Sequence, residues 1–536
     1  MTARPLATTI KALGRKTRRF LRRYQTRKGN VAMIFALSIP VVVAASLSAV
    51  DLHRASTVHM QLQDALDAAT LAAARSTATT TAQIQSIGDG ALKANLKNFT
   101  NASLTSDTFT LNADGTVVSS AAMDVKPMIA NLFLGSDMNV GAKTQVVRQN
   151  YKLEVALVLD NTGSMAQDNK LVNAKTAANS LIDMLAAGAA RSTDPNAVRI
   201  SLVPFSSTVK IGSTYQNQTW IDQNGSSPIN DLIFPTGGTT TPSAYQHANR
   251  FTLFTKMNIA WGGCVESRQY PYDVQDTAPS VGTPATLFTP YFAPDEPDTS
   301  AYSAWSSYDS TNNYISDNMT ANTTNKNWWK RQGDIAKYKS SGLDLSSGKG
   351  PNQYCTMAPV MRMTTSFSSL KTAINGMVAT GNTNVPMGLM WGWHTISPNA
   401  PFADGLAYGT DKLRKIVILM TDGDNTNDVY NNPNNSVYSG LGFIWETRLG
   451  ASIGVSSTAT QRTTAMNSRF TELCGNMKAK NIEIYVIGVE VASTTSSLLS
   501  TCATDASHYF DVTNSADLNA TFQTIAGQIA NLHLSQ

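Results

Sequence analysis

The sequence predicts an α/β protein, with a doubly wound, mostly parallel sheet that carries a long insertion and follows a transmembrane helix and a small α+β subdomain. Three observations predict this class. From residue 152 onward, short apolar runs alternate with helical patterns, as in parallel sheets whose strands are joined by helices. Residues 31–50 contain no charged side chain. Residues 80–150 combine one helical stretch with strand-like segments.

The N-terminal region is predicted to be a membrane anchor. Residues 1–28 form a basic arm with ten Lys or Arg and no acid, and residues 31–50 are an uncharged apolar run. A run of about 20 residues can cross a hydrocarbon core of about 30 Å. The arm favours a cytoplasmic N-terminus, so we expect a single-pass protein of the inner (cytoplasmic) membrane with a periplasmic C-terminal part. A cleaved signal peptide is the alternative, but the helical pattern continues to residue 75.

The charge distribution argues against a nucleic-acid-binding protein. The formal net charge is +5, but ten of the 42 basic residues lie in the arm, so the rest of the chain carries 32 basic and 37 acidic residues. Binding of phosphates requires a basic surface on the folded domains. The arm has only Phe20 and Tyr24 as aromatic residues, too few for stacking on bases.

Between the span and the sheet, two regions are expected. Residues 29–75 comprise the transmembrane helix and its Ala-rich extension, and residues 76–150 form the α+β subdomain. In this subdomain we expect a helix over 82–99, a hairpin of strands 108–111 and 116–119 with its turn at Ala113-Asp114-Gly115, and a strand over 139–148.

Residues 151–536 supply the sheet. Strands are expected over 153–159, 198–205, 415–420, 482–489 and 508–512, and helices over 170–187, 367–378, 386–396, 460–480, 496–502 and 516–532. Residues 206–366 interrupt the alternation and are too long for an ordinary loop. Because they contain Trp261, Trp305, Trp328 and Trp329, we expect a folded insertion over the edge where the strands end. Residues 425–458 form a second interruption at that edge.

The cysteines predict disulfides. All four, Cys264, Cys355, Cys474 and Cys502, follow the predicted span, and an even number in an exported domain indicates two bonds. Three pairings are possible. We favour Cys264–Cys355, which closes the insertion on itself, with Cys474–Cys502, which ties together the helices on either side of strand 482–489. No C-x-x-C spacing is present, so a zinc site is not expected.

Oxygen-bearing side chains follow two of the predicted strands. Asp160, Thr162 and Ser164 come directly after the first strand, and Asp422 follows the apolar run 415–420. The carboxyl ends of parallel strands meet at one edge of a sheet, where ligands bind. Carboxylates and hydroxyls are ligands that a hard divalent cation prefers, which predicts a site for Mg²⁺, or for Mn²⁺ or Ca²⁺.

A further loop is expected to complete this site. We favour Thr383 in Gly381-Asn382-Thr383-Asn384, which precedes a predicted helix, over Thr239 in Gly237-Gly238-Thr239, which precedes irregular sequence. The competing interpretation is that all these residues only cap helices and shape turns.

Two resemblances support the metal site. The motif Asp160-Asn161-Thr162-Gly163-Ser164 between strand and helix resembles the metal-ion-dependent adhesion site of von Willebrand factor A domains. Nearly the whole chain resembles TadG-like proteins of Tad (Flp pilus) assembly, through RRYQTRKGNVAMIFALSIPVVVAASLSAVDLHR, LQDALDAATLAAAR, WGGCVESR, VALVLDNTGSM, GNTNVPMGLMWGWHTISP and ILMTDGDN. The resemblance implies an A domain whose cation is held by Asp160, Thr162, Ser164, Thr383 and Asp422. Related pseudopilins carry a Glu shortly after the processing glycine, whereas Gly29 is followed by Asn-Val-Ala-Met-Ile, so processing at Gly29 is not expected.

The predicted function is therefore non-enzymatic. The sequence offers no credible Ser-His-Asp triad and no Walker loop. We expect an envelope protein of the pilus-assembly type that binds a protein partner of that machinery through the cation. The alternative is a released or surface-exposed adhesin that contacts host or matrix ligands, which the N-terminal anchor disfavours.

Overall fold

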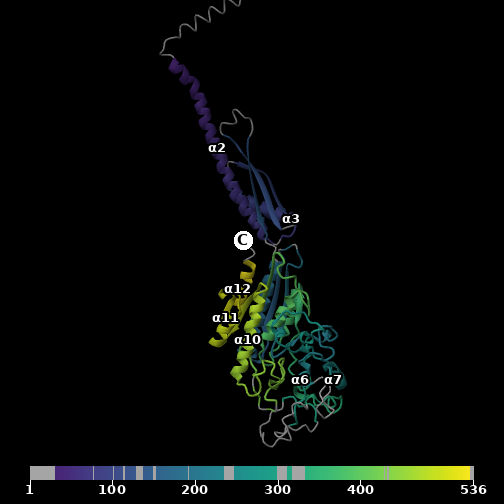
Figure 1. The fold of residues 1–536 in the computed structure, drawn as a ribbon. Coiled ribbons are helices and arrows are strands. Elements are labelled where there is room, and N and C mark those ends of the chain that lie inside the picture. The colour runs from purple at the N-terminus through teal and green to yellow at the C-terminus, as the bar shows by residue number, and fades with distance from the viewer. Residues whose placement is uncertain are drawn as a thin grey trace, which may run out of the picture. The chain divides into compact units, whose positions relative to one another are not determined.

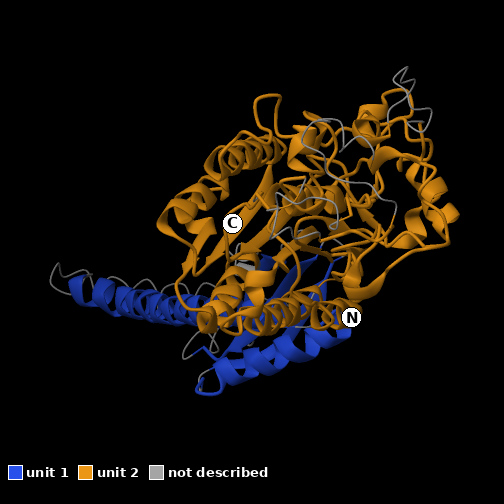
Figure 2. Ribbon diagram, turned by 90° about the horizontal axis from the view of Figure 1, so that it is seen from below, with its two compact units in different colours: residues 1–148 blue, residues 149–536 orange. Residues whose placement is uncertain are grey.

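The chain folds into two compact units, residues 1–148 and residues 149–536 (Figure 2). The division lies beside the boundary at residue 150 that the sequence predicts. The computed structural model describes residues 30–76, 78–99, 102–112, 115–127, 137–148, 152–190, 192, 194–234, 247–298, 311–316, 332–427, 429–430, 432 and 434–531. The sequence features outside the described residues are the basic arm, Gly29, Ala113, Asp114, Gly237-Gly238-Thr239, Trp305, Trp328 and Trp329.

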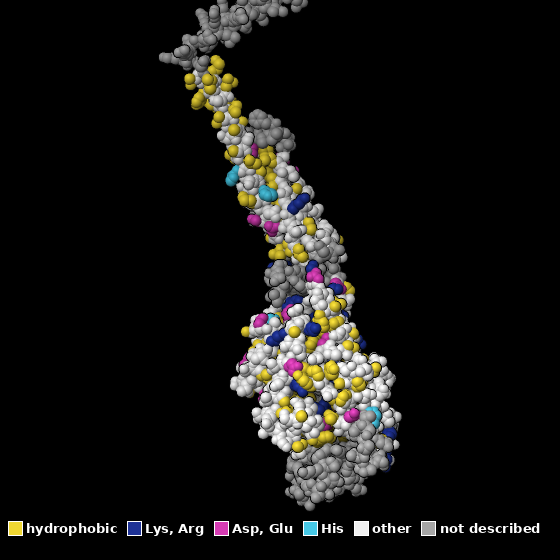
Figure 3. Space-filling model, in the orientation of Figure 1, with side chains coloured by type: hydrophobic (Ala, Val, Ile, Leu, Met, Phe, Trp, Pro, Cys, Tyr) yellow, Lys and Arg dark blue, Asp and Glu magenta, His cyan; other side chains and the backbone are white. Residues whose placement is uncertain are grey.

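The first unit is organised around one long helix, α2 (Asn30–Arg75), of 46 residues (Figure 1). At 1.5 Å per residue it extends for about 70 Å. Its N-terminal part exposes apolar side chains such as Val31, Phe35 and Leu37. Figure 3 shows hydrophobic side chains gathered along this end of the helix. Among the described residues, α2 is the helix long and apolar enough to cross a membrane. The helix continues unbroken beyond the apolar run, as expected for an anchor.

The C-terminal part of α2 packs into a small α+β fold, as predicted. It is joined by α3 (Thr81–Leu96) and by a three-stranded antiparallel sheet of β1 (Ala102–Leu111), β2 (Thr116–Val125) and β3 (Met138–Val147). Leu62, Leu66, Leu92, Phe109 and Val117 form its buried core. The strands β1 and β2 are longer than predicted, because most of their additional residues are Ser, Thr and Ala, which give little apolar alternation.

The second unit is built on a six-stranded sheet in the order β11-β10-β9-β4-β5-β8. The five predicted strands pair in parallel: β4 (Lys152–Asp160), β5 (Val198–Phe205), β9 (Leu413–Thr421), β10 (Ile482–Val489) and β11 (Tyr509–Val512). The short edge strand β8 (Met361–Thr364) is antiparallel to β5 and was not predicted. Its four residues, partly exposed, are too few to show a period.

Helices cover both faces of this sheet. One face carries α5 (Lys170–Ala189), α8 (Phe367–Asn375) and α12 (Leu518–Asn531), and the other carries α9 (Val385–Ile396), α10 (Ala459–Lys478) and α11 (Ser493–Cys502). Alternate residues of β4 serve the two faces: Val155, Leu157 and Leu159 pack toward α5, whereas Ala156 and Val158 pack toward α9. The strands are thus buried on both faces, which explains their continuous apolar sequences.

The glycines of α9 let this helix approach the sheet closely. A Cβ on Gly388 would lie 2.3 Å from the Phe205 ring, and one on Gly392 would lie 2.4 Å from Val158. These positions therefore exclude any side chain, and α9 is pressed against β4 and β5.

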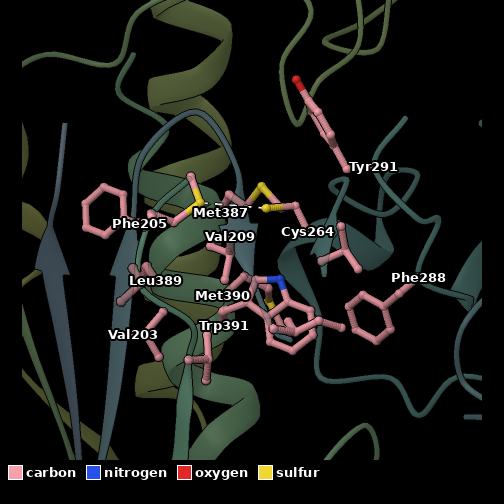
Figure 4. Close-up of a cluster of buried hydrophobic side chains, with 14 of the residues drawn as sticks. Val203, Phe205, Val209, Cys264, Phe288, Tyr291, Met387, Leu389, Met390 and Trp391 are labelled. Carbon is pink, nitrogen blue, oxygen red and sulfur yellow. Dashed lines mark hydrogen bonds between the residues drawn. The ribbon is translucent and has the colours of Figure 1, made fainter. Parts of the chain in front are cut away.

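The described part of the insertion is folded, with β6 (Val209–Lys210), β7 (Cys264–Val265), α6 (Asn230–Ile233) and α7 (Arg250–Met257). Figure 4 shows Val209, Cys264 and Phe288 of the insertion gathered with Met390 and Trp391 of α9 in one buried cluster. The insertion therefore packs against the α9 face of the sheet, and does not simply lie over the edge as expected. The apolar side chains that fix it there are scattered in sequence, so no periodic pattern revealed this position.

Both favoured disulfides are confirmed. Cys264–Cys355 closes a loop across 91 positions, and Cys474–Cys502 joins α10 to α11 across 28. A buried cluster of Arg250, Glu266, Tyr438 and Arg448 further ties the insertion to the second interruption.

We predict a pH-dependent stability from Glu296, a buried acid of the insertion. Burial raises the pKa of Glu296 to about 7, although its carboxylate accepts hydrogen bonds from the amides of Thr311 and Asn312. The pKa of Glu296 is thus higher in the folded state than in the unfolded state. Glu296 therefore adds to the free energy of unfolding at low pH, where it is protonated, and this contribution is lost as pH rises from about 4.5 to about 7. Glu296→Gln should therefore gain stability relative to wild type over this window, by on the order of 3 kcal/mol. Urea unfolding at pH 4.5 and pH 8 measures the difference, and parallel pH profiles would contradict it.

Candidate functional site

The predicted site residues come together at the carboxyl edge of the sheet. β4 and β9 are neighbouring parallel strands, with Leu159 paired to Met420. Asp160 follows Leu159 as the last residue of β4, and Asp422 directly follows the end of β9 at Thr421. The edge is completed by the loop between α8 and α9, which carries Thr383, and by the residues after β5.

A chain of hydrogen bonds joins four of the five predicted residues. The Thr162 amide donates to Asp160 Oδ1 (2.8 Å). The hydroxyls of Thr162 and Ser164 lie 3.0 Å apart, and Ser164 Oγ donates to Asp422 Oδ1 (2.7 Å). The hydroxyl of Thr421, which the sequence analysis did not single out, donates to Asp160 Oδ2 (2.6 Å). Both oxygens of Asp160 are thus held in place.

The loop of Thr383 is fixed beside this chain through its backbone. The Gly163 amide donates to the Gly381 carbonyl (3.0 Å), and the Thr380 amide donates to the Asn161 carbonyl (2.8 Å). The Thr426 amide, from the loop after β9, donates to the Thr383 carbonyl (3.0 Å), and the Thr383 amide donates to the Thr426 hydroxyl oxygen (2.9 Å). The Thr383 side chain is buried, and no hydrogen bond joins its hydroxyl to the other four predicted residues, all of which the structure describes.

Burial dominates the electrostatics of the site. Asp160 is fully buried, and this burial, followed by the nearby charge of Asp422, raises the pKa of Asp160 to about 6. Lys170, the first residue of α5, places its ammonium 3.1 Å from Asp422 Oδ2 and 3.5 Å from Glu490 Oε2. Neither Lys170 nor Glu490 was singled out from the sequence. Lys170 follows the Asp160 motif by only a few residues, but no local pattern links Glu490 to it.

The arrangement departs from simple helix capping. Thr162 precedes the 3₁₀ turn η1 (Gly163–Ala166), and Asn169 precedes α5, yet neither side chain makes a capping hydrogen bond. Asp160 does shape the turn through the Thr162 amide, but Ser164 reaches across to Asp422 on another loop. Asp424 points to a different partner, since the Thr495 hydroxyl of α11 donates to it.

The donors fit a hard divalent cation. Two carboxylates and several hydroxyls converge without nitrogen or sulfur ligands, the chemistry that suits Mg²⁺ with water completing its shell. The buried Ser206 hydroxyl, next to Gly381, has no hydrogen-bond partner among the described residues and adds a further oxygen at this edge. In the described parts of the chain, no group of three or more His, Cys, Asp or Glu is placed so that it could hold a metal ion.

The sequence contains one motif with hydrolase-like spacing, although no Ser-His-Asp triad is expected. Gly450-Ala451-Ser452-Ile453-Gly454 has the spacing of a nucleophile elbow. However, it lies in turns that precede α10, not between a strand and a helix. It therefore lacks the structural context that exposes a nucleophilic serine.

We predict that Gly381 is required for the loop of Thr383. Its φ of +72° lies in the left-handed region, and a Cβ there would lie 3.2 Å from Ser206 Oγ. Gly381→Ala should lower the free energy of unfolding by about 1 kcal/mol or more. The matched control is Gly376→Ala, because Gly376 has φ −78° and its added Cβ would meet nothing closer than 3.5 Å. Urea unfolding compares the two, and equal losses would contradict a specific role for Gly381.

The chain matches two family models. Residues 29–76 match "Putative Flp pilus-assembly TadE/G-like", and residues 154–259 match "von Willebrand factor type A domain". No curated protein matches.

Solved structures give distant likenesses. The pilus adhesin SpaC from Lactobacillus rhamnosus GG has 12% identity and a TM-score of 0.32, covering 81% of this chain and 35% of SpaC. The vWF domain of the type V pili tip protein Mfa5 from Porphyromonas gingivalis has 13% identity and a TM-score of 0.32, covering 72% of this chain and 97% of that domain. The pilus adhesin RrgA from Streptococcus pneumoniae has 11% identity and a TM-score of 0.32, covering 78% of this chain and 49% of RrgA.

This chain thus spans only about a third of SpaC. Together, the family matches and the observed sheet show that the protein joins a TadE/G-like N-terminal segment to a von Willebrand factor type A domain.

Proposed function

We propose that the protein is a membrane-anchored, non-enzymatic component of Flp pilus assembly whose A domain binds a protein partner through a divalent cation. The observation that carries the proposal is the convergence of Asp160, Thr162, Ser164 and Asp422 in one hydrogen-bond chain, beside the loop of Thr383. The TadE/G-like match at residues 29–76 supports the link to pili.

The residues have complementary roles in this proposal. Asp160 and Asp422 supply negative charge, and Thr162, Ser164 and Thr383 supply neutral hydroxyls. A bound Mg²⁺ or Mn²⁺ would act as an electrophile, because few carboxylates neutralise it. An acidic side chain of the partner is then the natural additional ligand. Calcium is disfavoured by the small number of charged oxygens.

The helix α2 supports anchoring. Its exposed apolar part is followed without a break by the packed part, so the same helix connects the span to the folded subdomain. We propose an inner-membrane location with the A domain in the periplasm. A released or surface-exposed adhesin remains the competing proposal, and cell fractionation distinguishes the two.

We predict that Mg²⁺ or Mn²⁺ stabilises the second unit and that Asp160→Asn abolishes this effect. A ligand at 100 times its Kd stabilises the folded state by about 2.7 kcal/mol. All eight Trp residues lie in the second unit, so Trp fluorescence of the full chain in detergent follows that unit alone. The control is Asp183→Asn, because Asp183 is exposed on α5 and pairs with Lys371.

Partner capture provides the second readout for the same variants. Capture from envelope extract should require the cation and should fail for Asp160→Asn but not for Asp183→Asn. Identical unfolding curves of the wild-type protein in chelator and in millimolar Mg²⁺ or Mn²⁺, with partner capture intact in chelator, would contradict the metal-site proposal.

We also predict the topology. A periplasm-active reporter fused after Gln536 should be active, because the basic arm retains the N-terminus in the cytoplasm. Activity of a cytoplasm-specific reporter at the same position would contradict this orientation.

A further inference from the structure

We infer that Lys170 is a resident cation that competes with the divalent ion for Asp422, and that Glu490 is the carboxylate that holds the Lys170 ammonium when the ion is bound. The inference rests on the proposed metal site. It makes Lys170 and Glu490 residues that set the affinity of the site without being ligands.

The first step is the position of Lys170. As the first residue of α5, its backbone amide donates to the Gln167 carbonyl (3.0 Å), which fixes the start of the side chain. Only 10% of the side chain is exposed, and its ammonium contacts Asp422 and Glu490 together. Lys170 therefore sits between an inner carboxylate, Asp422, and an outer one, Glu490.

The second step is charge balance. Asp160 and Asp422 are both buried at this edge, and the desolvation of carboxylates is costly unless a positive charge offsets it. Among the described residues, Lys170 is the basic side chain that forms an ion pair with either of them. It therefore stabilises the site in the absence of a metal ion.

The third step is competition. The two oxygens of Asp422 are engaged, Oδ1 by the Ser164 hydroxyl and Oδ2 by Lys170. A divalent ion placed among Asp160, Thr162 and Ser164 would meet the positive charge of Lys170 at short range. Repulsion between two cations at such distances is strong when the surroundings are partly buried. Binding of the ion is thus weakened by Lys170 for as long as it stays on Asp422.

The fourth step is the role of Glu490. Its Oε1 accepts a hydrogen bond from the Ser515 amide (2.8 Å), and its own amide donates to the Val512 carbonyl (2.7 Å). Glu490 is thus held at the end of β10, with Oε2 directed to Lys170. Its side chain is 24% exposed, against 0% for Asp422, so the Glu490 end of the pair is the more solvated one. This gives the ammonium a fixed second acceptor away from the inner carboxylate.

The alternative is a permanent structural ion pair. In that case the ion pair of Lys170 and Asp422 would only stabilise the fold. Changing Lys170 or Glu490 would then alter stability without altering metal affinity.

Three variants of the full chain in detergent separate these interpretations. Lys170→Met removes the charge and keeps much of the apolar stem, Glu490→Gln keeps the acceptor for Ser515 but removes the charge, and Lys175→Met is the control. Lys175 lies on the same helix and donates to the Asn375 carbonyl, away from the site. Calorimetry with Mg²⁺, and Mn²⁺ binding by electron paramagnetic resonance, measure affinity. Trp fluorescence in chelator measures stability of the second unit.

The two site variants should move the affinity in opposite directions. Lys170→Met should bind Mg²⁺ and Mn²⁺ at least about tenfold more tightly, and should melt earlier in chelator. Glu490→Gln should bind several-fold more weakly, because Lys170 then has only Asp422 as a partner. Lys175→Met should match wild type in both measurements.

The outcomes also separate this inference from the metal site itself. Binding by Lys170→Met where wild type binds too weakly to detect would support the inference. Wild-type affinity in both site variants would overturn it and leave the metal site intact. Absence of binding in wild type and in Lys170→Met would overturn both.

Discussion

The parallel register of β4 against β9 is the constraint on which the rest of the site depends. It pairs Leu159 with Met420, so Asp160 and Asp422 emerge at one edge. The register is fixed by packing on both faces, since Val155, Leu157 and Leu159 must face α5 while Ala156 and Val158 face α9. A slip of one residue would exchange these sets and bring bulky side chains against the closely packed α9. The same packing that stabilises the core therefore positions the carboxylates.

The long insertion contributes to the site by supporting the α9 face. Its aromatic residues bury α9 from the side opposite the sheet, with Phe288 against Trp391. α9 in turn begins directly after the Thr383 loop, and the Asn384 side chain accepts a hydrogen bond from the Met387 amide at its start. The insertion thus stabilises α9, and α9 in turn fixes the end of the Thr383 loop. Its two disulfide-linked cysteines, Cys264 and Cys355, close the segment that provides this support.

Most of the sheet was predictable because its strands are buried on both faces and read as continuous apolar runs. The strands 198–205 and 482–489 were predicted with the bounds that the structure gives. The Asp160 motif could be recognised because its residues are contiguous in the sequence. Lys170 and Glu490 were missed because their contact spans 320 positions and has no local signature. The placement of the insertion on the α9 face was missed because isolated aromatic residues, not a period, determine it.

The candidate site is held together by contacts within the chain. Two buried acids are partly balanced by one lysine, and the oxygens of Asp160 are satisfied by the Thr162 amide and the Thr421 hydroxyl. The edge is therefore hydrogen-bonded and partly charge-compensated by the chain itself, whereas the ligands of a structural zinc site require the metal in order to fold. In the proposed function, ion binding would therefore add to an edge that these contacts already hold together. In the proposed function, an ion bound at this preformed edge would gain a further ligand from the carboxylate of a partner, and the two binding events would then be coupled.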